Sequence, residues 1–173
     1  MKSNGRRVYT VGIAAFLVGL LGGGFLFGNL LHESSHALAC LLFGLPYLLS
    51  WGQVVYARSP DPLVNFFVRL AGGAGQASFS LLLFWYATML EKRVLIRTVQ
   101  NLKRSLDLSM LFGFELAFLT IAFHGIITGI VESLFYQSYL QTYDNFLIWG
   151  TIVLICGITS FVILYERPSR LLK

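Results

Sequence analysis

The sequence predicts an all-α polytopic membrane protein with about four transmembrane helices, and three observations support this fold class. First, 56% of the 173 residues are hydrophobic and only 12% are charged, whereas a soluble domain carries about a quarter charged residues. Second, the mean hydropathy is +0.71. Third, long apolar runs alternate along the chain with short polar or basic segments. We expect a single membrane domain over residues 1–173.

The first apolar run covers residues 8–43, which is far more than the roughly 20 residues that cross a bilayer. Gly22, Gly23 and Gly24 interrupt it and predict either a turn between two spans or a break in one long helix. Basic residues cluster before this run, in residues 91–107 and at the C-terminus. These clusters share one side of the membrane only if the run crosses once, so we favour four crossings with both termini cytoplasmic.

The remaining segments differ in composition. Residues 45–61 are β-prone and predict a short hairpin at the membrane surface. Residues 63–90, 108–135 and 146–165 are the expected second, third and fourth spans. Residues 91–107 are basic and amphipathic, which predicts an interfacial helix on the cytoplasmic side. The net charge is +5, but the basic residues gather at helix ends, where they orient a protein in the membrane rather than bind nucleic acid. We therefore expect contacts with lipid, no contact with nucleic acid, and a location in the cell (plasma) membrane.

Residues 32–36 read His-Glu-Ser-Ser-His and lie inside the first apolar run. On an α-helix, His32 and His36 lie one turn apart on the same face, so both imidazoles can bind one metal ion. Glu33 is placed to activate water rather than to bind the metal. The alternative is a pair of packing histidines that hydrogen-bond to neighbouring helices. We favour a metal centre, with Zn²⁺ as the ion.

A catalytic zinc site has three protein ligands and leaves one position for water. The sequence has three histidines, and the third, His124, lies in the middle of the span over residues 108–135. We predict His124 as the third ligand; the alternative is a hydrogen bond to Thr120 or to another helix. Glu132 lies two turns further on, about 12 Å along the helix, and is the reserve ligand.

With these residues the sequence resembles the site-2-protease group of intramembrane zinc metalloproteases, the peptidase M50 family, as a divergent member. The similarity covers residues 32–39, with Gly44 shortly after them. The family continues with a surface strand region, a helix with a Gly-Pro-x-x-Asn-like motif, and a helix with an Asp-Gly pair whose Asp binds the metal. Here residues 72–76, Gly-Gly-Ala-Gly-Gln, stand in the second position, and residues 124–125, His-Gly, stand in the third.

The resemblance implies a zinc-dependent endopeptidase that cleaves transmembrane segments of membrane proteins, with Glu33 as the general base. It also implies that Gly73 and Gln76 contact the substrate and that the strand region over residues 51–57 pairs with an unwound substrate segment. Gly73, Gln76 and His124 stand where the family has Pro, Asn and Asp. A second function therefore stays open: a catalytically silent M50-like subunit that stabilises a larger membrane complex. A membrane protein that handles metal ions is a third possibility.

Overall fold

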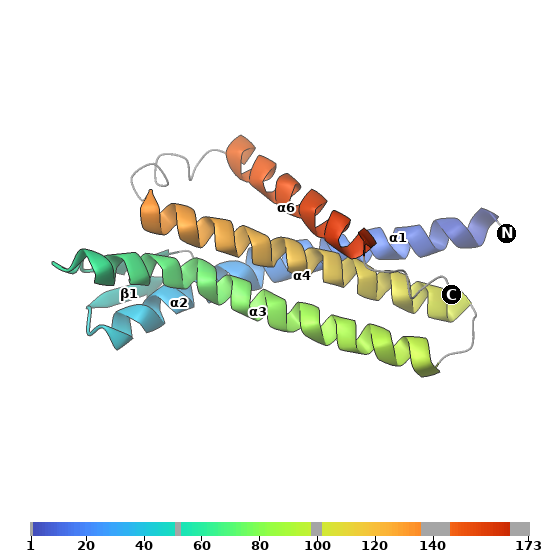
Figure 1. Cartoon of the computed structure of the whole chain (residues 1–173), viewed down its shortest axis with the longest axis horizontal. Coiled ribbons are helices and arrows are strands. Elements are labelled where there is room, and N and C mark those ends of the chain that lie inside the picture. Colours follow the sequence, from blue (N-terminus) through green and yellow to red (C-terminus); the bar gives the residue numbers. More distant parts are fainter. Residues whose placement is uncertain (1, 51–52, 98–101, 136–145, 167–173) are drawn as a thin grey trace.

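The computed structural model contains four helices that are long and apolar enough to cross a membrane, together with one two-stranded sheet. The structure describes residues 2–50, 53–97, 102–135 and 146–166. The helices run along the length of an elongated molecule, and the sheet lies at one end of it (Figure 1). This architecture is consistent with the multi-pass membrane protein that the sequence predicts.

The first span is one continuous helical rod rather than two crossings. It consists of α1 (Lys2–Val18), the π-helical segment η1 (Gly19–Gly28) and α2 (Asn29–Leu42). Gly28 has helical backbone angles (φ −61°, ψ −46°), so the chain enters α2 without a turn. The expected long first helix is present, and its three consecutive glycines lie where the winding is wider, since π-helical hydrogen bonds join residues five apart.

The predicted surface hairpin follows α2. Gly44 ends the helix in the left-handed conformation (φ 66°), which glycine adopts without a steric penalty. Strand β1 (Tyr47–Ser50) then pairs in antiparallel fashion with β2 (Gln53–Tyr56). The side chain of Tyr56 packs against a small buried cluster of Ala39, Cys40 and Val68. The hairpin is therefore attached to the outer end of α2, close to the His-Glu-x-x-His turn.

Helix α3 (Pro62–Arg97) begins at a capped end. The side chain of Asp61 accepts a hydrogen bond from the Leu63 N–H at 2.8 Å, and Pro at the first helical position has no N–H that needs a partner. The side-chain amide of Asn65 accepts a hydrogen bond from the Ser59 N–H at 2.9 Å and donates one to the Ser59 carbonyl at 2.7 Å. These bonds fix where the chain leaves the hairpin and enters α3.

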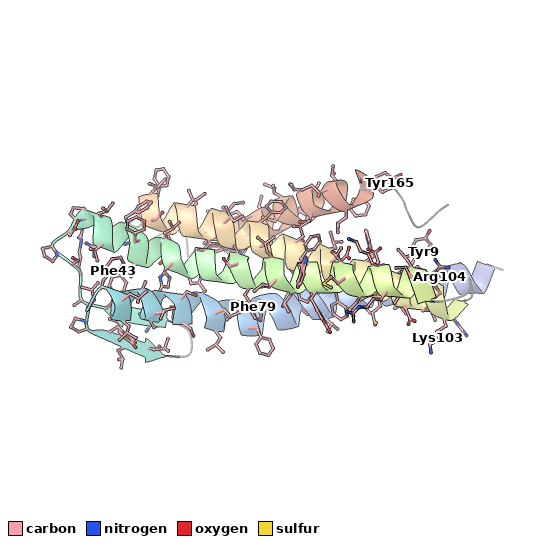
Figure 2. The ribbon with its side chains drawn as sticks, turned by 60° about the horizontal axis from the view of Figure 1, so that its bottom comes forward. Tyr9, Phe43, Phe79, Lys103, Arg104 and Tyr165 are labelled. Atoms are coloured by element: carbon pink, nitrogen blue, oxygen red, sulfur yellow. The ribbon has the colours of Figure 1, made fainter. Side chains whose placement is uncertain are left out.

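Helix α4 (Leu102–Leu134) is the central element, because it contacts α1, η1, α3 and α6 (Phe146–Glu166). Lys103 and Arg104 near its start lie at the end of the molecule opposite Phe43 and the hairpin (Figure 2). The start of α1 lies at that same end (Figure 1).

The prediction of a separate interfacial helix over residues 91–107 is wrong for the described part of that segment. Residues 91–97 continue α3, and residues 102–107 belong to the start of α4. In the described residues of this segment, the charged side chains lie on the ends of two long helices that reach beyond their apolar parts. Residues 98–101, the predicted connection over 136–145 and the C-terminal basic cluster lie outside the described residues.

Glycines allow α3 and α4 to approach closely. Gly73 of α3 faces the backbone of Gly125 and Gly129 of α4, and an added Cβ on Gly73 would collide with both. Small residues permit this kind of close backbone contact between helices in a membrane. The crossing fixes the last three turns of α4 against the first third of α3, and it lies next to the histidines.

Candidate metal centre

The two motif histidines point their Nε2 atoms at one place. His32 and His36 lie on successive turns of α2, and both side chains are buried. Their Nε2 atoms are 3.0 Å apart. The helical spacing that the sequence indicates is therefore realised, and both imidazoles lie in the interior between the helices.

Glu132 of α4 completes this group. Its Oε2 atom lies 3.2 Å from Nε2 of His32, and its Oε1 atom lies 3.4 Å from Nε2 of His36. One ligand atom from each of the three residues lies within 4.8 Å of the other two. Two imidazoles and one carboxylate form the ligand set of many catalytic zinc sites, which keep a fourth position for water or substrate. The group can hold a metal ion.

Val68 of α3 orients one of the imidazoles. The Nδ1 atom of His36 lies 2.6 Å from the Val68 carbonyl oxygen. A carbonyl oxygen only accepts hydrogen bonds, so Nδ1 carries the proton and donates it. In the neutral ring, the lone pair of Nε2 is then directed at His32 and Glu132. Metal-binding histidines usually make such a bond with their second nitrogen, which fixes the ring and the tautomer.

The donor atoms and the space around them fit a cation. When His36 is neutral, its Nε2 lone pair and the Glu132 carboxylate converge in a buried site, and a bound cation would offset their mutual repulsion. Gly72 of α3 lies against this point: an added Cβ would sit 2.7 Å from Nε2 of His32 and even closer to Nε2 of His36. Zinc binds imidazole nitrogen at about 2.0–2.1 Å. The missing side chain of Gly72 therefore leaves the room that an ion needs beside both nitrogens.

Glu33 lies beside this group and outside it. Its side chain is buried, and its Oε2 atom accepts a hydrogen bond of 2.7 Å from the Val54 N–H of β2. Among the described residues, the convergent ligand atoms belong to the two histidines and Glu132, not to Glu33. This placement, next to the ligands but not among them, is the one that a general base requires.

His124, the expected third ligand, is not part of the convergent group. Its ring lies 5.5 Å from that of Trp149 on α6, and its Nδ1 atom lies 3.5 Å from Oγ1 of Thr128. Eight residues correspond to about 800° of helical rotation, so His124 and Glu132 differ in direction by about 80°. The structure thus reverses the predicted order: the reserve ligand Glu132 reaches the histidine pair, and His124 faces α6.

The other predicted site residues have different surroundings. Gly73 is buried in the crossing of α3 and α4, where it packs against Gly125 and Gly129. Gln76 is buried, and its Nε2 atom would lie 3.2 Å from a Cβ built on Gly28. It therefore extends from α3 to the last residue of η1, close to the start of α2. Cys40, one turn beyond His36, belongs to the apolar cluster beneath the hairpin.

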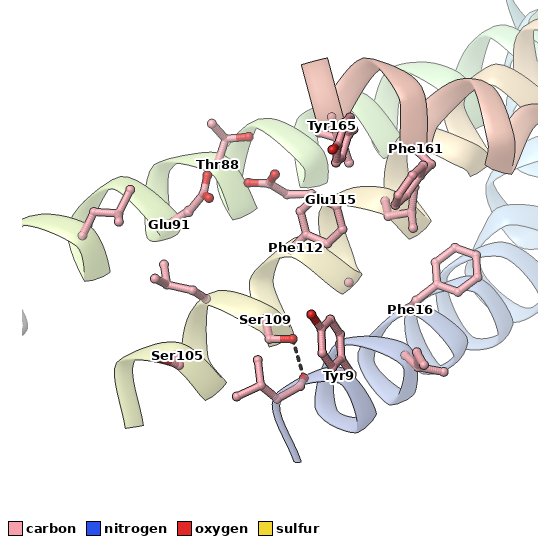
Figure 3. A pocket seen from close by; sticks show the side chains of 18 of the residues that line it. Tyr9, Phe16, Thr88, Glu91, Ser105, Ser109, Phe112, Glu115, Phe161 and Tyr165 are labelled. Carbon is pink, nitrogen blue, oxygen red and sulfur yellow. Dashed lines mark hydrogen bonds between the residues drawn. The ribbon is translucent and has the colours of Figure 1, made fainter. Parts of the chain in front are cut away.

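A cavity of 1110 Å³ lies away from the histidines, between α1, α3, α4 and α6 (Figure 3). Glu115, Thr88 and Ser109 contribute polar atoms to a mainly aromatic and aliphatic wall. Ser109 donates a hydrogen bond of 2.6 Å to the Val8 carbonyl, which joins α4 to α1. None of the predicted site residues lines this cavity.

Three contributors to the site are not indicated by the sequence. Val54 and Val68 act through backbone atoms, for which an apolar side chain gives no signal. Gly72 has a weak signal, because it stands in a small-residue patch that also fits plain helix packing. No family model matches the chain, and no curated protein and no solved structure matches it either. The case for a metal centre therefore rests on the geometry of these residues.

Proposed function

We propose that this chain is an intramembrane zinc metalloprotease of the site-2-protease type, which cleaves transmembrane segments of other membrane proteins. The observation that supports this most is the buried group of His32, His36 and Glu132 with the Glu33 carboxylate beside it. A structural zinc site would have four protein ligands, whereas the described residues supply three ligands here and an adjacent acid, as in hydrolytic sites.

The three ligand residues would hold the zinc ion through two Nε2 atoms and one carboxylate. Zinc in such a site activates water and polarises the carbonyl group under attack. The hydrogen bond from His36 to the Val68 carbonyl keeps one imidazole in position, and Gly72 keeps the space beside both rings open. All of these contacts come from α2, α3 and α4, so the bundle itself preorganises the site.

Glu33 would act as the general base and then as the general acid. Its carboxylate takes a proton from the attacking water and returns it to the amine of the leaving peptide. Glu33 is the residue next to His32 on α2, so the base and this ligand are held by the same helical turn. Because the side chain is buried, bulk water does not compete for the proton at this point.

The substrate is a transmembrane segment that has locally lost its helical structure, because helical hydrogen bonds and side chains shield the peptide bonds of an intact helix. The hairpin offers an edge next to Glu33 on which an extended segment can dock. Gln76 is the polar side chain of α3 that extends toward the start of α2, and it would hydrogen-bond the substrate backbone. The basic residues Lys103 and Arg104, opposite the hairpin, favour a cytoplasmic location for that end in the cell membrane.

Metal analysis combined with a cleavage assay tests this function. Wild type, Glu33→Gln and Glu115→Gln are purified in detergent without chelators, and bound zinc and cleavage of a transmembrane reporter are measured. Glu115→Gln is the control, since it changes a buried glutamate that lines the distant cavity.

We expect stoichiometric zinc in all three proteins and cleavage by wild type and Glu115→Gln only. Zinc without cleavage in wild type would instead indicate the catalytically silent subunit. Absence of zinc from all three proteins would overturn the metal centre.

A further inference from the structure

The alternation of hydrogen-bonded and non-hydrogen-bonded residue pairs along the hairpin determines which N–H groups point outward. The Ala57 N–H donates to the Pro46 carbonyl at 3.0 Å, so these two residues form a hydrogen-bonded pair. Bonded and non-bonded pairs alternate along antiparallel strands. Leu49 and Val54 face each other three pairs further on, so they form a non-bonded pair. Their N–H groups therefore point away from each other, out of opposite edges of the hairpin.

The outward N–H of Val54 has an acceptor on another element, the Oε2 atom of Glu33 at 2.7 Å. Hydrogen bonds to an ionised carboxylate are stronger than neutral ones. The side chain of Glu33 therefore occupies the edge of β2 at Val54. In this state the Glu33 carboxylate, which belongs to α2, is hydrogen-bonded to the hairpin.

An extended peptide that adds to the edge of β2 needs the same N–H group. In an added strand, outward N–H groups of the edge strand donate to main-chain carbonyls of the new strand. One N–H has one strong linear hydrogen bond to give. A peptide can therefore dock at this edge only if the hydrogen bond between Val54 and Glu33 is broken.

We infer that the Val54 amide is a shared donor that couples the docking of an extended peptide to the freedom of Glu33. While the edge is empty, the amide holds the carboxylate. When a peptide adds to β2, the amide passes to a peptide carbonyl, and Glu33 is released toward the two imidazoles. This inference rests on the proposed function for its purpose, but the exchange of hydrogen-bond partners can be measured without catalysis.

Amide hydrogen exchange tests whether the Val54 N–H switches its hydrogen bond from Glu33 to a docked peptide. The full chain carries ¹⁵N-valine, and amide exchange is followed in micelles for wild type and Glu33→Ala. Since the outward amide depends on Glu33 for its protection, Glu33→Ala should speed its exchange about tenfold or more. The Val55 amide, which belongs to a bonded pair within the hairpin, is the internal control and should not change. Equal Val54 exchange in both proteins would overturn the inference.

The same Glu33→Ala protein then tests the second half of the exchange. A reporter peptide of alternating Leu and Ala, with a central Gly-Ser pair, is added at saturation. Because this variant lacks the carboxylate, renewed protection of the Val54 amide has to come from the peptide. An unprotected Val54 amide with the peptide bound would show that the peptide docks elsewhere, and the inference would fail even if the protein is a protease.

Two proline variants connect the exchange to turnover of that reporter. Val54→Pro removes the outward N–H at the edge near Glu33, and Leu49→Pro removes the equivalent N–H at the opposite edge. Proline at such positions leaves the ladder between the strands intact. We expect Val54→Pro to raise KM about fivefold or more while kcat stays within about twofold of wild type, and Leu49→Pro to change neither. A lower kcat at unchanged KM for Val54→Pro would contradict the coupling.

Discussion

The Nε2 atom of His32 lies 3.2 Å from the Oε2 atom of Glu132, although the two residues are 100 positions apart in the sequence. One belongs to α2 and the other to the last turn of α4, and both helices pack against α3. Helix α3 contributes Gly72 to the space beside the imidazoles and Val68 to the orientation of His36. The candidate metal centre is therefore built by three helices, and substitutions in each helix give separate predictions.

Glu132→Ala should lower zinc affinity about 100-fold or more, because it removes a ligand, whereas His124→Ala should leave the affinity unchanged. The two residues lie on the same helix, so each variant controls for general damage to α4. Competition with a chromophoric chelator measures both affinities. The opposite result, with zinc lost only from His124→Ala, would restore His124 as the third ligand.

Gly72→Ala should reduce zinc binding at least about tenfold while all three ligands remain in the chain. The added methyl group would occupy the space next to the two Nε2 atoms. Gly157→Ala on α6 is the matched control, because an added Cβ there meets nothing within 4 Å. Both proteins are compared for bound zinc and for thermal unfolding in the same detergent. Full zinc occupancy in Gly72→Ala would show that the ion binds elsewhere.

Gly73→Ala should act on stability rather than on the ligands. The new Cβ would collide with the backbone of Gly125 and Gly129, and the helices would have to separate. Overpacking of this kind costs about 1–3 kcal/mol. Denaturant unfolding of the zinc-free protein should show the loss relative to wild type and to Gly157→Ala. A Gly73→Ala protein as stable as wild type would mean that the crossing is looser than the structure indicates.

Zinc should stabilise the folded chain. A ligand that binds only the folded state at about 100 times its Kd raises the free energy of unfolding by about 2.7 kcal/mol. Thermal unfolding of wild type should therefore shift upward on addition of zinc and return after treatment with a chelator. His32→Ala removes a ligand and should lose most of the shift, while His124→Ala should keep it. An equal shift in both variants would point to unspecific zinc binding.

The sequence predicts those parts of the structure that depend on local pattern. Long apolar runs identify the four helices, Gly44 and the residues after it identify the hairpin, and the spacing of four residues places His32 and His36 on one face. Each of these features follows from interactions within a few residues. For the described residues, the prediction of a separate interfacial helix was wrong, because a drop in hydropathy does not by itself end a helix.

The choice between Glu132 and His124 could not be made from local pattern. Both are polar residues in an apolar helix, and both require an explanation at that depth. The rotation of α4 about its axis decides which of them faces α2, and the glycine contacts between α3 and α4 set that rotation. The same holds for Val54, whose role depends on the phase of a hairpin that packs onto α2.

Segment η1 sets the angular position of the two histidines of the candidate metal centre relative to α1. It joins α1, which packs on α4, to α2, which packs on α3, and it does so with wider turns and five glycines. Each residue of an α-helix advances the chain by about 100°. Deleting one residue from this segment would turn His32 and His36 by about a quarter of a turn relative to α1, away from Glu132. The number of residues in η1 thus works as a spacer, and natural variants of this protein should tolerate substitutions there more readily than insertions or deletions.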